Sequence, residues 1–369
     1  MKYLFINSVA GFGSTGRLAE EKCRELMAQG HQCVIAYGRK ASDCGPVPTV
    51  RIGTDWDCRF HALESRLLDN VGFGSRQATR KFLQWVRSYD PDVIWLHNLH
   101  GYYIHIGELF AYLRSCGKKI LWTLHDCWAF TGHCAYFDYA GCDRWKTGCH
   151  NCPEKRTYPQ SLLRDGSAEN YARKKALFTG ISNLSLIVPS NWLKQRVQAS
   201  FLGQYPVEVV YHQVDRQIFK PRASDFRREQ GLEGKILLLG VASVWDRRKG
   251  LEDFLSLARM LDERYAIVLI GLNDRQRRNL PENVLALPRT ATVQQLAQIY
   301  SAADIFLNPS MEETFGLTVL EAECCGTPAV VYEGTACQEI AEQFGGRAVP
   351  RGPEHLLEAV QALTKERMV

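Results

Sequence analysis

Short apolar segments alternate with helical segments along almost the whole chain, and this alternation constrains the fold more than any other feature. The first run of apolar segments comprises residues 3–9, 33–37, 92–97, 119–125 and 186–189. Each segment has the length of a buried strand, and the stretches between them have the pattern of helices that cover a sheet. The pattern predicts a parallel sheet with helices on both faces.

A second run of the same kind fills the C-terminal half, with strands predicted at residues 235–242, 266–270, 284–287, 305–308 and 329–332. A chain of 369 residues also exceeds what one hydrophobic core usually serves. We therefore expect an α/β protein of two Rossmann-like parallel-sheet domains that face each other across a cleft, where the strand ends bind ligands. The expected domains are residues 1–210, with a cysteine-rich insertion at 127–155, and residues 211–369, whose last helix is expected to pack back on the first domain.

The charge and hydropathy of the chain narrow its location and partners. A net charge of +5 suits anionic ligands or an anionic membrane surface, but it is too small to indicate nucleic acid. The sequence shows neither a secretory signal nor a run of roughly 18 apolar residues. The expected location is the cytoplasm, with peripheral contact at the inner face of the membrane as a further expectation. The basic side chains considered for such contact, which a solvated helix face explains equally well, are Arg76, Arg80, Lys81, Arg87, Lys174 and Lys175.

A glycine loop follows the first predicted strand, and residues 11–16 match the pattern G-x-G-x-x-G. A dinucleotide site would also need an acidic residue after the second strand, where this chain has Arg39, so only an NADP-dependent oxidoreductase fits. A tight turn between strand and helix is the second interpretation. The third, which we favour, is a cleft loop that faces an anionic group or a sugar and comprises Gly13, Ser14, Thr15, Gly16 and Arg17.

The most specific string of the sequence is residues 308–322, in which a strand, a short loop and a helix follow one another. Seven residues separate Glu313 from Glu321. The amides of Phe315, Gly316 and Leu317 lie where a helix begins, and such amides suit a pyrophosphate or sugar hydroxyls. A carboxylate one turn into that helix can accept two hydrogen bonds from a ribose diol.

This string resembles the Glu-x7-Glu motif of retaining glycosyltransferases of family 4, and residues 300–306 and 325–330 resemble the same family. The resemblance implies the GT-B architecture and a donor that is a UDP- or GDP-linked sugar. It also implies that an arginine and Lys249 neutralise the pyrophosphate. The family's usual arginine would precede Lys249 by a few residues, where this chain has Ser243 and Val244, so that Arg247 or Arg248 takes its place. The implied donor-binding residues are Arg248, Lys249, Arg289, Thr314, Phe315, Gly316, Leu317 and Glu321.

Histidines mark the ends of two predicted strands in the first half. His125 follows the apolar run 120–124, and His97 and His100 follow the preceding strand. In the family that the chain resembles, a histidine at this strand end contacts the transferred sugar, so the resemblance implies His125 and Glu313 as catalytic residues. It also implies that the anomeric configuration is retained without a catalytic metal, because positive side chains stabilise the leaving diphosphate.

Five cysteines crowd into the predicted insertion, with the last two in a C-x2-C pair, and the last four of them are the candidates for a metal site. Such thiols suit either a structural zinc site or a set of buried thiols without metal. Residues 122–134 look like bacterial transferases of the colanic acid or capsule type, and this resemblance implies an oligosaccharide acceptor linked to lipid. A non-catalytic, zinc-bearing sugar-binding module remains an alternative. The candidate zinc ligands are Cys134, Cys142, Cys149 and Cys152.

Overall fold

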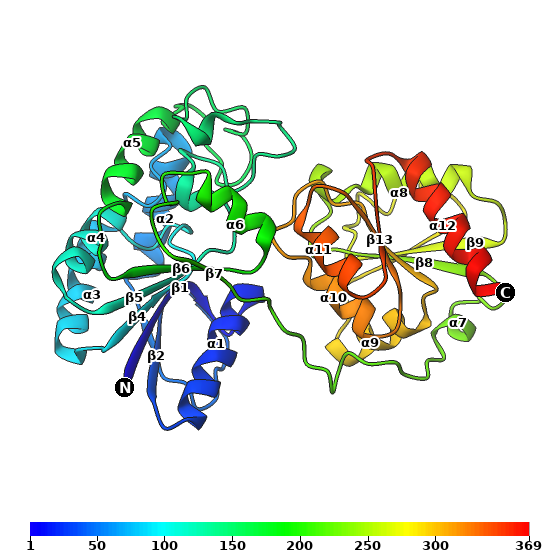
Figure 1. Ribbon diagram of the computed structural model, residues 1–369, viewed down its shortest axis with the longest axis horizontal. Helices are drawn as coiled ribbons and strands as arrows, with labels where there is room; N and C mark the ends of the chain where they lie inside the picture. The colour runs from blue at the N-terminus through cyan, green and yellow to red at the C-terminus, as the bar shows by residue number, and fades with distance from the viewer. Residues whose placement is uncertain (369) are drawn as a thin grey trace. The chain divides into compact units, whose positions relative to one another are not determined.

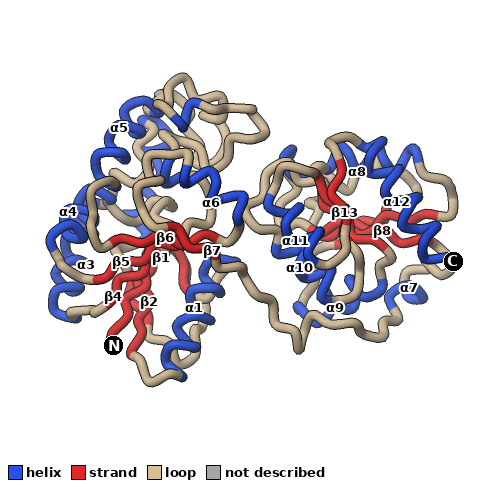
Figure 2. The backbone as a smooth tube through the Cα atoms, viewed as in Figure 1, coloured by secondary structure: helices blue, strands red, loops and turns tan. Residues whose placement is uncertain are grey.

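The computed structural model describes residues 1–368, which form two compact units. The first unit comprises Met1–Val210 and the second begins at Tyr211. Each unit contains one fully parallel sheet with helices packed against it (Figures 1 and 2). This is the α/β class that the alternation of strands and helices predicts.

The sheet of the first unit has the strand order β3-β2-β1-β4-β5-β6-β7. The order reverses between β1 and β4, and the carboxyl ends of these strands therefore flank a topological switch point, where ligands of open α/β sheets bind. The strands are β1 (Lys2–Ala10), β2 (Gln32–Ala41), β3 (Thr49–Arg51), β4 (Val93–Leu96), β5 (Lys119–Thr123), β6 (Leu184–Val188) and β7 (Val207–Val209).

The helices of the first unit begin at recognisable capping residues in several cases. The side chains of Thr54, His105 and Ser190 accept hydrogen bonds from backbone amides in the first turns that follow them. The helices are α1 (Gly13–Ala28), α2 (Asp55–Leu68), α3 (Arg76–Tyr89), α4 (Ile106–Ser115), α5 (Ser167–Phe178) and α6 (Asn191–Gln198), with short 3₁₀ turns η1 (Trp128–Phe130) and η2 (Arg144–Lys146).

The sheet of the second unit has the order β10-β9-β8-β11-β12-β13. Its strands are β8 (Ile236–Val241), β9 (Tyr265–Ile270), β10 (Val284–Leu287), β11 (Ile305–Asn308), β12 (Ala329–Tyr332) and β13 (Arg347–Val349). Its helices are α7 (Phe226–Glu229), α8 (Leu251–Met260), α9 (Val293–Ala302), α10 (Leu317–Cys324), α11 (Ala336–Gln343) and α12 (Pro353–Met368), with the 3₁₀ turn η3 (Arg247–Lys249).

Alternate side chains of the second sheet supply two separate cores. In β8, Leu237 and Leu239 pack with the helices α9, α10 and α11, whereas Leu238 packs with α8 and α12. Because successive residues of a strand point to opposite faces, a strand buried on both faces must be apolar throughout. Figure 1 shows α12 beside α8 in this unit. The packing of this helix on the first unit stays a prediction.

The strands that the sequence predicts are all present, with one correction near the first candidate site. The segment 119–125 was expected to be a strand throughout, but β5 ends at Thr123 and His125 lies in the turn beyond it. The three-residue strands β3, β7 and β13 were not predicted, because an edge strand of this length has no readable period. No helix within residues 1–368 combines the length and the apolar character that crossing a membrane requires.

Candidate active site

The loop before α10 is shaped by a glycine that no other residue would replace without strain. Gly316 has φ +94° and immediately precedes the first residue of α10, Leu317. A Cβ at this position would lie 2.8 Å from the Sγ atom of Cys337. The backbone therefore turns sharply at Gly316, between the string Glu312-Glu313-Thr314-Phe315 and the first turn of α10.

Two basic side chains from η3 lie against the loop that precedes α10. Lys249 forms an ion pair with Glu313. The guanidinium of Arg248 lies 2.7 Å from Asp246 and 3.6 Å from Glu312, which is buried. The Met311 amide donates to the Arg248 carbonyl at 2.7 Å and so fixes the two segments together. Two cations with carboxylate partners thus lie beside the start of α10, and a bound diphosphate would have to compete with those carboxylates.

Glu321 lies in the second turn of α10, and its carboxylate is positioned by a hydrogen bond from a tyrosine. The Tyr300 hydroxyl donates a hydrogen bond to Oε2 of Glu321 at 3.0 Å. Burial, followed by the charge of Glu321, raises the pKa of Tyr300 well above its usual value, so that this hydroxyl remains a donor. The hydrogen bond fixes one oxygen of the Glu321 carboxylate. A carboxylate that accepts hydrogen bonds from a ribose diol needs such a fixed orientation.

Arg289 lies close to the end of β8. Its guanidinium donates to the Ser243 carbonyl at 2.6 Å. Ser243 and the η3 residues both follow β8. This contact therefore brings Arg289, an implied donor-binding residue, to the same end of the sheet as Lys249. The buried side chains of Thr314 and Phe315 complete the set that the sequence predicted in this unit.

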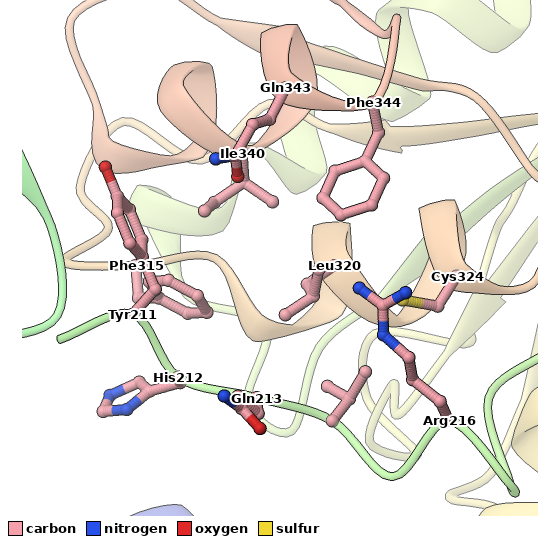
Figure 3. Close-up of a pocket in the computed structure, with 11 residues that line it drawn as sticks. Tyr211, His212, Gln213, Arg216, Phe315, Leu320, Cys324, Ile340, Gln343 and Phe344 are labelled. Carbon is pink, nitrogen blue, oxygen red and sulfur yellow. The ribbon is translucent and has the colours of Figure 1, made fainter.

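A pocket of about 320 Å³ lies between the chain segment that starts at Tyr211, α10 and α11 (Figure 3). Phe315, Leu320 and Cys324 line one side, and the guanidinium of Arg216 lies next to Cys324. The pocket shares Phe315 with the predicted donor residues, but none of its lining residues is one of the predicted charged ones. The predicted charged donor residues therefore lie outside this pocket, and the donor site at the cations near η3 stays a prediction.

In the first unit, the ends of β4 and β5 bring two histidines together. Nδ1 of His97 lies 2.9 Å from Nε2 of His125, and the two rings stack at a centroid distance of 5.2 Å. The Trp122 indole donates to the His97 carbonyl at 3.1 Å. The prediction that His125 lies at this strand end is consistent with this placement, and His97 is its direct neighbour.

A second chain of hydrogen bonds at the same strand ends includes His100. Its Nε2 lies 2.7 Å from Asp126, and its Nδ1 lies 2.9 Å from the Tyr158 hydroxyl. Burial would raise the pKa of Asp126, but His100 and the Trp128 amide more than offset this and lower it. Asp126 therefore stays ionised and orients the His100 ring, which in turn binds Tyr158.

Family models match both halves of the chain. The model described as Glycosyltransferase Family 4 matches residues 15–218, and the model described as Glycosyl transferases group 1 matches residues 234–366. The chain belongs to glycosyltransferase family 4. A member of this family is a glycosyltransferase, and the matches support neither the NADP-dependent oxidoreductase nor the non-catalytic module considered above.

Individual relatives of this family 4 glycosyltransferase agree with the assignment. The putative colanic acid biosynthesis glycosyl transferase WcaC of Escherichia coli is 24% identical over 287 residues, which are 74% of this chain and 67% of WcaC. The alpha-galactosylglucosyldiacylglycerol synthase of Streptococcus pneumoniae is 29% identical over 149 residues, which are 36% of this chain and 38% of that protein.

Solved structures show the fold of this transferase. Sucrose-phosphate synthase from Thermosynechococcus elongatus has a TM-score of 0.69 at 17% identity and covers 99% of this chain and 90% of its own. HepE of Anabaena, solved in complex with UDP and glucose, has a TM-score of 0.66 at 15% identity and covers 100% of this chain and 91% of its own. The architecture is GT-B, as predicted.

The glycine loop of the family 4 transferase is a tight turn. A Cβ at Gly16 would lie 3.1 Å from Cγ2 of Val9 and 3.2 Å from the Gly11 amide nitrogen, so the helix can approach the strand only at a glycine. Ser14 and Arg17 are exposed on the first turns of α1. The turn interpretation therefore holds at Gly16, and the cleft-loop role of Gly13, Ser14, Thr15 and Arg17 stays a prediction.

The cysteine-rich segment is anchored by buried polar contacts. Lys174 donates to the carbonyls of Trp128 and Thr131 at 2.7 and 3.1 Å, and its ammonium lies 3.5 Å from the centre of the Trp128 ring. Nδ1 of His133 lies 2.5 Å from Asp69. Lys174 is buried, so it is not available for the lipid contact considered from the sequence.

The thiols of this segment do not form a metal site in the structure. Within residues 1–368, no group of three or more His, Cys, Asp or Glu side chains is arranged to hold a metal ion. Cys134 and Cys152 share a hydrogen bond that lowers the pKa of the Cys152 thiol below its usual value, and the Gly132 amide donates to Cys149 Sγ at 3.2 Å. The arrangement fits the alternative of thiols without metal and gives no support to zinc at Cys134, Cys142, Cys149 and Cys152.

Several residues of the site were not predicted. Glu312 and Asp246 hold Arg248, Tyr300 holds Glu321, and Tyr158 binds His100. Asp246 directly precedes the basic turn, and Glu312 directly precedes Glu313. Their position next to predicted site residues in the sequence could have identified these two carboxylates. No local signal pointed to the tyrosines, because their partners are distant in the sequence.

Proposed function

We propose that this glycosyltransferase moves a sugar from a UDP- or GDP-linked donor to a saccharide, with retention of the anomeric configuration and without a catalytic metal. The observation that carries the proposal is the position of Lys249 and Arg248 next to the start of α10, with Glu313 and Glu321 on either side of Gly316. HepE, a structural neighbour, is solved with UDP and glucose, which supports a nucleotide sugar as donor.

The proposed roles follow from the charge of each group. When the glycosidic bond to the donor breaks, negative charge develops on the leaving diphosphate, and Lys249 and Arg248 stabilise it together with the amides of Phe315, Gly316 and Leu317. Glu321 accepts hydrogen bonds from the ribose, Arg289 and Thr314 contact the nucleotide, and Glu313 binds the hydroxyls of the sugar. Positive side chains take the place that a divalent ion would otherwise fill.

The proposed chemistry needs no nucleophilic carboxylate. The bond between the anomeric carbon and the diphosphate oxygen breaks, and the acceptor hydroxyl attacks from the same face. The departing phosphate oxygen takes the acceptor proton, so that atoms and charge balance without a further reagent. His125, with His97 next to it, is proposed to contact the transferred sugar and stabilise the positive charge that develops on its ring.

The proposed acceptor is an oligosaccharide linked to lipid, and the proposed pathway is the assembly of a bacterial surface polysaccharide. The support for this is the similarity to WcaC, the putative colanic acid biosynthesis glycosyl transferase of Escherichia coli. We further propose that the protein works in the cytoplasm and makes peripheral contact with the inner face of the membrane.

Slow donor hydrolysis without an acceptor tests the proposed chemistry. The protein is incubated with UDP-linked and GDP-linked sugars, with and without a chelator, and proton NMR follows the first anomer released. We expect one nucleotide series to be hydrolysed, the chelator to have no effect, and the released sugar to keep the donor's anomeric configuration. Release of the opposite anomer, or loss of hydrolysis with the chelator, would contradict retention or metal independence respectively.

A further inference from the structure

Helix α2 of the first unit exposes a row of large apolar side chains. Trp56, Phe60, Leu63 and Leu67 are 64%, 66%, 55% and 37% exposed. Their spacing of four, three and four residues places all of them along one face of the helix. The opposite face of the helix is buried through His61 and Ser65. Helix α2 therefore packs on its own unit with polar side chains and exposes its apolar side chains to solvent.

A loop from the cysteine-rich region extends this apolar row. The amides of Leu162 and Arg164 donate to the carbonyls of Arg66 and Leu67 at 2.7 and 3.1 Å. These bonds hold the loop against the C-terminal end of α2, where Leu162 and Leu163 are 48% and 71% exposed. We call the resulting surface the apolar face, which consists of Trp56, Phe60, Leu63, Leu67, Leu162 and Leu163.

The acidic side chains of α2 are engaged within the protein. Asp55 forms an ion pair with Arg51, and Asp57 closes the capping box with Thr54. Glu64 accepts a hydrogen bond from the Asn70 side chain at 2.6 Å. These carboxylates are therefore held by groups of the first unit.

Arg164 of the loop pairs with Glu169, but three other arginines around the apolar face have no such partners. Arg59 and Arg66 are exposed on the flank of the helix, and Arg156 is exposed in the adjoining loop. Within the described part of the chain, none of these three arginines forms an ion pair with a carboxylate. The guanidinium of Arg59 lies over the Trp56 ring, 5.1 Å from its centre. The surroundings of the apolar face thus carry uncompensated positive charge.

We propose that the apolar face docks on a bilayer that contains anionic lipid. Water-exposed apolar rows of this size are uncommon on soluble domains. Aromatic and leucine side chains flanked by arginines are the composition of helices that lie in the interfacial plane of a membrane. The charge complements anionic headgroups, whereas a neutral protein surface would leave the arginines without counter-charge.

This assignment differs from the one suggested by the basic residues of the sequence. Arg76 and Arg80 of α3 both pair with Glu108, and Lys174 is buried. The loop that carries Leu162 also reaches the strand ends that hold His100, because Tyr158, four residues before Leu162 in the chain, forms a hydrogen bond with His100. A lipid-linked saccharide held at the apolar face would therefore have its sugar end close to these strand ends. The docking itself does not depend on the proposed transfer reaction.

Co-sedimentation of the full chain with vesicles tests the proposal without donor or acceptor. We compare vesicles of an equimolar mixture of phosphatidylethanolamine and phosphatidylglycerol with vesicles of phosphatidylcholine alone. We expect binding to the anionic vesicles that is at least about tenfold stronger and that weakens with added salt. A variant with Trp56→Ser and Phe60→Ser should lose about tenfold or more of this affinity, and a variant with Arg59→Glu and Arg66→Glu should lose the preference for anionic lipid.

The control is a variant with Met260→Ser and Val293→Ser, which removes two exposed apolar side chains of the second unit and should bind as the unaltered protein does. Leu163→Ser, in an exposed loop, serves as a second variant if the helix substitutions prevent folding. Failure of the unaltered protein to bind, or equal binding by all variants, would overturn the proposal. So would a dimer in analytical ultracentrifugation that the α2 substitutions dissociate, because the face would then be a protein interface. Loss of sugar transfer with intact vesicle binding would instead contradict the proposed function alone.

Discussion

At the scale of single residues, two neighbouring arginines of the basic turn η3, which precedes α8, differ in their contacts. Arg248 is held by Asp246 and Glu312, and Lys249 by Glu313, whereas Arg247 is exposed and forms no ion pair among residues 1–368. A pre-positioned cation stabilises a transition state better than a mobile one, because it needs no reorganisation during the reaction. The sequence left open which arginine assists Lys249, and the geometry favours Arg248.

This difference predicts unequal effects of three substitutions. Lys249→Ala and Arg248→Ala should each lower kcat/KM for the donor by about 10²–10³, the usual loss when one charge-stabilising group is removed. Arg247→Ala is the matched control and should change kcat/KM by less than about threefold. The measurement is the rate of nucleotide release at subsaturating donor. Equal losses for Arg247→Ala and Arg248→Ala would refute the assignment.

At the scale of elements, the start of α10 depends on one backbone conformation. Gly316 has φ +94° and would bring a Cβ to 2.8 Å from Cys337, whereas Gly345 has φ +84° with open space around it. Gly345→Ala should therefore cost about 1 kcal/mol from the left-handed backbone alone. Gly316→Ala should cost roughly 1–3 kcal/mol more, since overpacking is added. Denaturant unfolding gives the free energy of unfolding of both variants. Equal losses would show that the Cys337 side chain moves aside without lowering the stability.

The buried face of α2 predicts a pH dependence of stability. His61 accepts backbone hydrogen bonds from Gly72 and Gly74, and burial lowers its pKa from 6.5 to about 4. A depressed histidine pKa contributes stability above the unfolded value of 6.5, and this contribution is lost as the pH falls towards about 4. Between about pH 8 and about pH 5 the loss should amount to about 2 kcal/mol.

His61→Gln is the matched control for this prediction. Glutamine retains a hydrogen-bond acceptor but does not titrate, so the variant should lose less stability over the same pH range. His212, whose pKa burial also lowers to about 4, is present in both proteins, and its effect cancels in the comparison. Urea unfolding at several pH values gives the free energy of unfolding. Identical pH profiles would rule out a charged-form penalty at His61.

At the scale of the whole molecule, the apolar period predicted the strands because it is a local property of the sequence. The strand, loop and helix of residues 308–322 were readable for the same reason, whereas their donor role stays a prediction. Phe306 and Leu307 alternate between two cores, so a continuous apolar run already indicates a strand buried on both faces. The Tyr300–Glu321 and His100–Tyr158 contacts were not predictable, because each joins residues that only the folded sheet brings together. The apolar face of α2 was missed for a related reason: its helical period was readable, but which side of the helix meets the core was not.

The central claim is that the second unit binds a nucleoside diphosphate through Glu321 and the cations near η3. A thermal-shift titration with UDP, GDP, ADP and NADPH, without added metal, tests it most directly on the unaltered protein, on Glu321→Ala and on the exposed-surface control Glu358→Ala. We predict that one nucleoside diphosphate raises the Tm of the unaltered protein and the control, and binds Glu321→Ala at least about tenfold more weakly, as the loss of a charge-assisted hydrogen bond implies. Stabilisation by NADPH alone, or equal nucleotide affinity in Glu321→Ala, would contradict the account.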